Sequence, residues 1–206
     1  MRSPRRSERG ATLVEAAFVT LPFLLVVFAI FEFGLAFRTD LTIENAGQRG
    51  SRSASVAGRA PEADFLIIES IKDGLDDGGM DQIQRVIVYN AASPTAPVPV
   101  ACLAIAGPPG TAGAGVPDLC NVYGPAALTA PLETSPGVAN DQWQCATSAS
   151  RDSNWCPTTR NVSFSAGPRD YIGVYIETSH DYVTRFFGSS VQLESNTISR
   201  LEPETE

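Results

Sequence analysis

An uninterrupted apolar stretch near the start of the chain limits what the rest of it can fold into. No charged residue occurs from Ala16 to Phe31, and residues 11–15 extend this stretch to 21 residues. At about 1.5 Å per residue, an α-helix of this length spans about 31 Å, which matches the hydrocarbon core of a lipid bilayer. We therefore expect a transmembrane helix over residues 11–37, with the lipid bilayer as a partner.

A cleavable secretory signal is the main alternative, because four arginines precede the apolar run. However, the run is longer than the roughly 7 to 15 residues of a signal-peptide core. The sequence that follows it, E-F-G-L-A-F-R-T-D, also lacks a good small-x-small cleavage site. Both features favour an anchor that stays on the protein.

The head of the apolar stretch carries a more specific pattern. Gly10 separates a basic leader, residues 1–10, from A-T-L-V-E, so that Glu15 is the fifth residue after the glycine. This arrangement resembles the processing site of type IV prepilins, in which a membrane peptidase cuts after the glycine. The resemblance implies that Gly10, Ala11 and Glu15 are the processing residues, that a prepilin-type peptidase is a partner, and that Ala11 is the mature N-terminus.

Glu15 also has a purely structural interpretation. Thr12 and Glu15 have the spacing of a capping box, in which a hydroxyl and a carboxylate satisfy free N–H groups at a helix start. Capping explains neither Gly10 nor the basic leader, and the two interpretations are compatible.

The longer sequence R-G-A-T-L-V-E-A-A-F-V-T-L-P-F-L-L, followed by F-E-F-G, is similar to the TadE-like proteins of tight adherence (Tad) pilus assembly. The similarity continues through residues 40–58 and returns in the closing S-N-T-I-S-R-L-E-P. It implies a non-catalytic pseudopilin, with the pilus subunit, other pseudopilins and an inner-membrane assembly platform as partners. Ala16 departs from the Tyr or Phe that often follows the glutamate in this system. A membrane-tethered periplasmic binding module is the alternative function, and it would need neither Gly10 nor Glu15.

Charge is distributed asymmetrically along the chain. The net charge is −8, of which residues 1–10 contribute +3 and the remaining chain −11. The positive-inside rule therefore predicts a cytoplasmic N-terminus and a C-terminal domain on the other side of the membrane. The resemblance to TadE-like proteins implies that this membrane is a bacterial inner membrane and that the domain is periplasmic. An acidic domain without a cluster of Lys and Arg argues against binding to nucleic acid.

All four cysteines follow the anchor, on the side of the membrane where disulfides persist. Their spacings of 18, 25 and 11 residues lack the close pairs typical of structural zinc sites, so we expect two disulfides and no metal. Three connectivities are possible, and the sequence alone does not decide among them; local pairing, Cys102 with Cys120 and Cys145 with Cys156, is the preferred expectation.

The remaining pattern predicts an α+β domain. Residues 38–60 read as a helical continuation of the anchor, in which Gly47 and Gly50 suggest a bend or close packing. The domain over residues 61–206 should contain an amphipathic helix at 62–75, which ends in D-D-G-G, and antiparallel strands at 84–90, 171–183 and 190–201. Residues 91–165 contain ten of the fifteen prolines and should form an irregular insertion.

Catalytic motifs are missing from the sequence, so we expect neither an enzyme nor a bound cofactor. His180, the one histidine, is most simply a polar strand position. Trp143 and Trp155 each lie near a cysteine and should pack over a disulfide, although an exposed Trp at a recognition surface is the alternative. Glu32, about 31 Å along the helix from Ala11, should behave as an ordinary interfacial residue.

Overall fold

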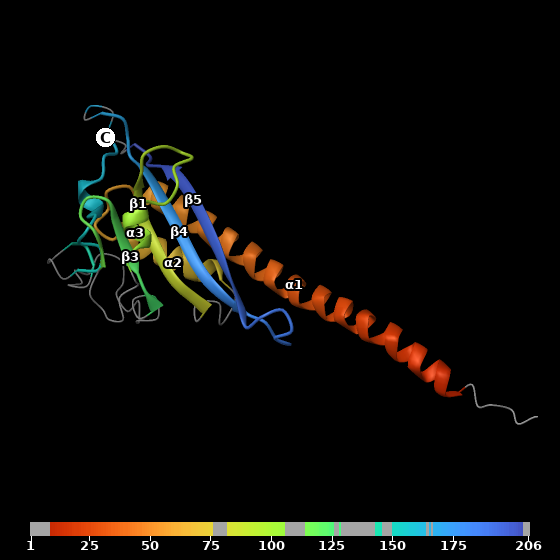
Figure 1. Cartoon of the computed structure of the whole chain (residues 1–206). Coiled ribbons are helices and arrows are strands. Elements are labelled where there is room, and N and C mark those ends of the chain that lie inside the picture. The colour runs from red at the N-terminus through yellow and green to blue at the C-terminus, as the bar shows by residue number, and fades with distance from the viewer. Residues whose placement is uncertain are drawn as a thin grey trace, which may run out of the picture.

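One long helix, α1 (Arg9–Ala57), connects the N-terminal end of the molecule to a folded domain (Figure 1). The computed structural model describes residues 9–75, 82–105, 114–125, 128, 143–145, 150–163, 165 and 167–203. The predicted anchor and its continuation thus form a single helix of 49 residues. It ends at Ala57, and the positive φ of 53° at the following Gly58 is the left-handed conformation that favours glycine after a helix.

The second helix, α2 (Ala63–Gly74), follows Pro61 as predicted and packs against α1. Its predicted apolar stripe is buried, and Phe65, Ile68 and Ile71 belong to the main core. The D-D-G-G sequence that we expected to end this helix lies outside the described residues.

The sheet has five antiparallel strands in the order β2-β3-β1-β4-β5. They are β1 (Ile83–Ala91), β2 (Ala114–Val116), β3 (Cys120–Tyr123), β4 (Tyr171–Asp181) and β5 (Ser190–Arg200). The three predicted strands correspond to β1, β4 and β5. Helix α1 packs against β4 and β5, and apolar residues of α2 join Val86 and Val88 of β1 in one core, so both helices lie on one side of the sheet (Figure 1). The predicted α+β class is confirmed.

The two faces of the sheet are covered by different parts of the chain. On β1, Val86 and Val88 join the core beneath α1 and α2, whereas the alternate residues Ile87 and Tyr89 face the other side. That second face packs against the segment that includes the short helix α3 (Val100–Leu103). Both faces of β1 are therefore buried.

The expectation of an irregular segment over residues 91–165 was wrong in part, because it contains β2, β3, α3 and the 3-10 helix η2 (Pro157–Thr159). Strands β2 and β3 are only three and four residues long, and the turn between them includes Asp118 at a φ of 58°. Strands this short carry too little periodic signal to stand out from a Gly- and Pro-rich background. They are held by pairing with β1, which is a tertiary effect.

Gly47 and Gly50 of α1 allow close packing, which was one of the two predicted explanations for them. A Cβ added to Gly47 would lie 2.7 Å from Ser195 Oγ on β5. A Cβ added to Gly50 would lie 2.7 Å from Ile71 Cγ1 on α2. Each glycine costs about 1 kcal/mol of helix stability relative to alanine, and here it lets the helix approach its neighbours.

Candidate functional site at the membrane junction

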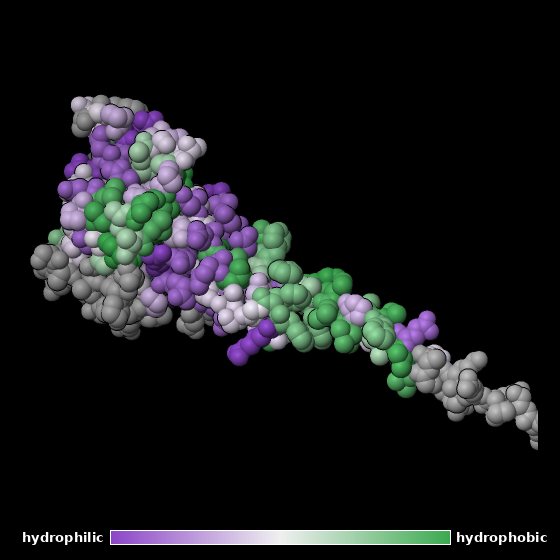
Figure 2. Space-filling model, viewed as in Figure 1, coloured by the Kyte–Doolittle hydropathy of each residue, from purple (hydrophilic) through white to green (hydrophobic). Residues whose placement is uncertain are grey.

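The first part of α1 projects from the domain with its side chains uncovered. From Thr12 to Phe31, twenty residues spanning about 30 Å, nearly every side chain is exposed, and Glu15 is the one charged residue. Figure 2 shows hydrophobic side chains gathered along this part of the helix, in contrast to the hydrophilic surface of much of the domain. Within the described residues, α1 is the one helix long and apolar enough to cross a membrane.

The predicted processing residues lie at the start of this helix. Gly10 and Ala11 have helical backbone, and Glu15 is exposed about one turn further along. Helix α1 already includes Arg9, so Thr12 lies inside the helix and not at the N-cap position that a capping box requires. The capping interpretation therefore does not hold for the uncleaved chain.

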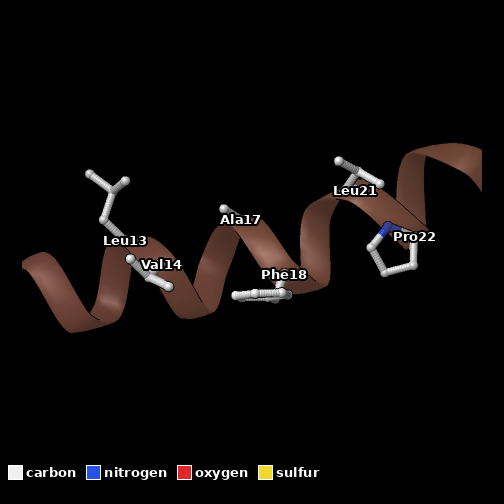
Figure 3. Close-up of a pocket in the computed structure, with 6 residues that line it drawn as sticks. All are labelled: Leu13, Val14, Ala17, Phe18, Leu21 and Pro22. Atoms are coloured by element: carbon white, nitrogen blue, oxygen red, sulfur yellow. The ribbon is translucent and has the colours of Figure 1, made fainter.

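The exposed helix has a shallow apolar groove near its beginning, shown in Figure 3. Pro22 is one of the residues that line it, and it has no N–H to donate to the carbonyl of Phe18 one turn earlier. The other lining residues are Leu13, Val14, Ala17, Phe18 and Leu21. Such a face is suited to apolar surroundings, such as lipid or a neighbouring transmembrane helix.

Glu32 marks the point where the domain first covers the helix. Its side chain is only 1% exposed, because the loop between β4 and β5 closes over it. The carboxylate accepts a hydrogen bond of 3.0 Å from the backbone N–H of Val183 and a second one from the N–H of Thr184. The expectation that Glu32 is an ordinary interfacial residue was therefore wrong. The sequence around Glu32 could not show this, because its hydrogen-bond partner Val183 lies 151 residues further along the chain.

Aromatic contacts extend this junction on both sides of Glu32. Phe28 stacks on Phe186 with ring centroids 5.9 Å apart, and Phe33 lies 5.5 Å from Phe187. Further along, Thr39 Oγ1 lies 3.1 Å from His180 Nδ1, so the one histidine of the chain joins β4 to α1. Beside these contacts a groove of about 620 Å³ is lined by Phe33, Gly34, Ala36, Phe37, Asp40, Tyr182, Val191 and Leu193.

A second polar cluster lies in the domain core. The carboxylate of Asp64 on α2 pairs with Arg160 at 2.5 Å, and neither side chain is exposed. Asp64 also accepts hydrogen bonds from Tyr123 and Asn121, and Asn121 in turn bonds both backbone polar groups of Trp155. The sequence contains no signal for this cluster, because its members come from three separate segments.

The burial of this cluster changes the acidity of neighbouring groups. Burial, reinforced by the negative charges of Asp64 and Asp152, raises the pKa of Tyr123 well above its ordinary value. Burial also raises the pKa of Asp152 to about 6, even though the N–H groups of Gln144 and Cys145 donate to its carboxylate. Because the cluster is sealed from solvent, it acts as a structural link between α2 and β3.

Both tryptophans are part of this core, so the alternative of an exposed recognition residue was wrong. Trp143 and Trp155 are each 3% exposed. Trp143 packs on Phe65 and Tyr123, and the guanidinium of Arg160 lies 4.2 Å from the ring centroid of Trp155.

The disulfides join Cys102 with Cys120 and Cys145 with Cys156, which is the local pairing that we expected. The first attaches α3 to β3 across a Cα–Cα distance of 6.3 Å. The second closes a short loop in front of η2, with a Cα–Cα distance of 5.9 Å. Both disulfides lie in the Pro-rich part of the chain and constrain it.

These observations define an α+β protein with one N-terminal helix that could span a membrane. Residues 10–52 match the model of the family described as TadE-like protein, so the predicted resemblance is confirmed over this segment. The match begins at the predicted processing glycine and ends within the part of α1 that packs on the sheet. Neither a curated protein nor a solved structure matches the chain.

Proposed function

We propose that this protein is a pseudopilin-like, membrane-anchored and non-catalytic component of a Tad pilus assembly or secretion apparatus. The observation that carries the proposal is the TadE-like match over residues 10–52, which coincides with the exposed apolar helix and its glycine-containing head. TadE-like proteins are associated with Tad pili and are generally not enzymes. The position of His180 agrees with this, since it is 9% exposed and faces Thr39.

The proposal gives the anchor a defined orientation. The basic leader stays in the cytoplasm, α1 crosses the inner membrane once, and the sheet domain with its disulfides lies in the periplasm. A prepilin-type peptidase removes residues 1–10, and the pilus subunit, other pseudopilins and an assembly platform are the partners of the mature chain. The bilayer covers the helix from Thr12 to Phe31.

Glu15 has a specific role in this proposal. An unpaired carboxylate one turn into the bilayer costs a few kcal/mol, so it requires a compensating charge. Cleavage after Gly10 creates an α-ammonium group at Ala11, about 6 Å along the helix from Glu15. This ammonium, on the same chain or on a neighbouring chain, is the proposed partner of Glu15 during assembly.

Pilus counts in a strain that lacks this protein test the proposal. We expect few or no pili, restored by the wild-type chain and not by Glu15→Ala, although the variant still inserts into the membrane. Glu69→Ala, which alters an exposed carboxylate on α2, is the control and should restore piliation fully. Normal piliation without the protein would favour a tethered binding module instead, and full restoration by Glu15→Ala would contradict the proposed role of that carboxylate.

A further inference from the structure

We infer that residues 182–189, the loop between β4 and β5, form a second membrane contact that enters the lipid headgroup region beside α1. This loop, called here the junction loop, presents large apolar side chains to solvent. Val183 is 75% exposed, Phe186 63% and Phe187 42%. An exposed aromatic cluster at a hairpin tip fits a surface that supplies an apolar partner.

The depth of the junction loop follows from its contacts with α1. Phe186 stacks on Phe28, which lies four residues, or about 6 Å, closer to the N-terminus than Glu32. Phe28 belongs to the twenty-residue exposed segment that is just long enough to cross the hydrocarbon core. If this segment spans the bilayer, Phe186 lies at or below the headgroups of the leaflet on the domain side.

Three backbone N–H groups of the junction loop have the hydrogen-bond partners that such a position requires. Backbone N–H groups without partners are costly in lipid, and those of Val183 and Thr184 donate to the buried carboxylate of Glu32. The N–H of Tyr182 donates to the carbonyl of Ser189 across the base of the loop at 3.0 Å. Arg185 is exposed at the tip, where a long cationic side chain can extend to lipid phosphates.

Lipid is the occupant that the geometry favours over a second protein. The aromatic cluster is continuous with the exposed apolar surface of α1, because Phe186 and Phe187 rest directly on Phe28 and Phe33. Lipid that surrounds the helix therefore meets the junction loop without any further rearrangement. The inference rests on the anchor alone and does not require a role in pili.

Fluorescence quenching in vesicles of phosphatidylethanolamine and phosphatidylglycerol tests the inference. The full-length Phe186→Trp variant is reconstituted in vesicles with or without phosphatidylcholine brominated near the headgroup, and its tryptophan emission is measured. The emission of the wild-type protein, which comes from the buried Trp143 and Trp155, is subtracted as the baseline. Val56→Trp is the matched control, since Val56 is 71% exposed and lies 24 residues, about 36 Å, along α1 from Glu32.

We expect the added tryptophan of Phe186→Trp to lose roughly half of its emission to shallow bromines, as an interfacial aromatic residue would. The added tryptophan of Val56→Trp should be unaffected. Equal quenching of the two variants would overturn the inference. The inference would also be overturned if the emission of the tryptophan at position 186 changed with the protein-to-lipid ratio but was not quenched by bromine. That result would mean that a second copy of the chain covers the junction loop.

Glu32→Ala supplies a readout of how the loop is held. In the Phe186→Trp background this variant should reduce the quenching, while α1 still resists extraction from the membrane by carbonate. Unchanged quenching would contradict the role of Glu32 in seating the junction loop. A pilus count is independent of both measurements, so a failure here is distinguishable from a failure of the proposed function.

Discussion

Glu32 and Val183 are 151 residues apart in the chain, yet the carboxylate of Glu32 accepts a hydrogen bond of 3.0 Å from the backbone N–H of Val183. This contact, with the parallel one to Thr184, attaches the β4–β5 hairpin to α1 at the edge of the exposed apolar helix. It supplements the packing of the later part of α1 on α2, β4 and β5.

Replacing Glu32 by alanine should loosen the junction loop. Two N–H groups would lose a charged acceptor, and hydrogen bonds to charged groups contribute about 1.5 to 3 kcal/mol each. Hydrogen exchange in detergent should therefore become faster at residues 182–189, and unfolding should require less denaturant. Glu69→Ala is the control, because its carboxylate is exposed on α2. Unchanged exchange in Glu32→Ala would show that the aromatic contacts alone hold the loop.

Processing should make Ala11 the mature N-terminus. Gly10→Val should keep residues 1–10 attached, because the resemblance to prepilins requires a glycine at the cut. Gly34→Val is the matched control, since a Cβ at Gly34 meets no atom within 4 Å and the position is outside the processing pattern. Intact mass of the membrane-extracted protein distinguishes the two lengths. Detection of Met1 on wild-type protein from cells that contain the peptidase would refute the prediction.

The disulfides should stabilise the Pro-rich segment locally. Native protein should lack four hydrogens by non-reducing mass analysis, since both pairs are formed. Changing Cys102 and Cys120 together to serine should cost about 3 kcal/mol in the chain-entropy model. Hydrogen exchange should then increase first in α3 and β3, whereas the same change at Cys145 and Cys156 should affect residues 150–160. Four free thiols in periplasmic material would contradict both pairings.

Gly173 should be intolerant of any side chain. It lies opposite Tyr89 in the β1–β4 pairing, and an added Cβ would come 2.2 Å from Tyr89 Cζ. The ring is buried and its hydroxyl donates to Asn196 Oδ1 at 2.8 Å, so it has little freedom to move. Gly173→Ala should destabilise the domain by about 1 to 3 kcal/mol through overpacking. Gly34→Ala should leave chemical unfolding unchanged or slightly improved, and equal midpoints for both variants would refute the argument.

Asp152 should make the domain less stable as pH rises. Its pKa is raised by burial from 3.8 to about 6, so between these values the folded protein binds a proton that the unfolded chain has released. The contribution of Asp152 to stability should therefore fall by up to roughly 3 kcal/mol from about pH 4 to pH 6 and stay level above that. Asp152→Asn should remove this slope, whereas Glu69→Gln should retain it. Parallel stability curves for wild type and Asp152→Asn would contradict the assignment.

The sequence alone determined the elements whose signals are local. The length of the apolar run predicted the anchor, the amphipathic pattern of residues 62–75 predicted α2, and the strand patterns at 84–90, 171–183 and 190–201 predicted β1, β4 and β5. The processing pattern around Gly10 and the TadE-like resemblance are also local, because both depend on neighbouring residues read in order. Such signals survive without tertiary contacts, since each depends on the periodicity or composition of one segment.

Only the tertiary structure decided which distant residues meet. Strands β2 and β3 are too short to be distinguished from a loop, and they form a sheet edge because β1 is there to pair with them. Glu32 has the sequence context of a membrane-surface acid, and a loop that folds back 151 residues later buries it. Asp64 and Arg160 likewise form a buried ion pair between segments 96 residues apart. The physical reason is the same in all three cases. Burial and hydrogen bonding depend on which distant residues the fold places next to each other, and the periodicity of a single segment carries no information about those neighbours.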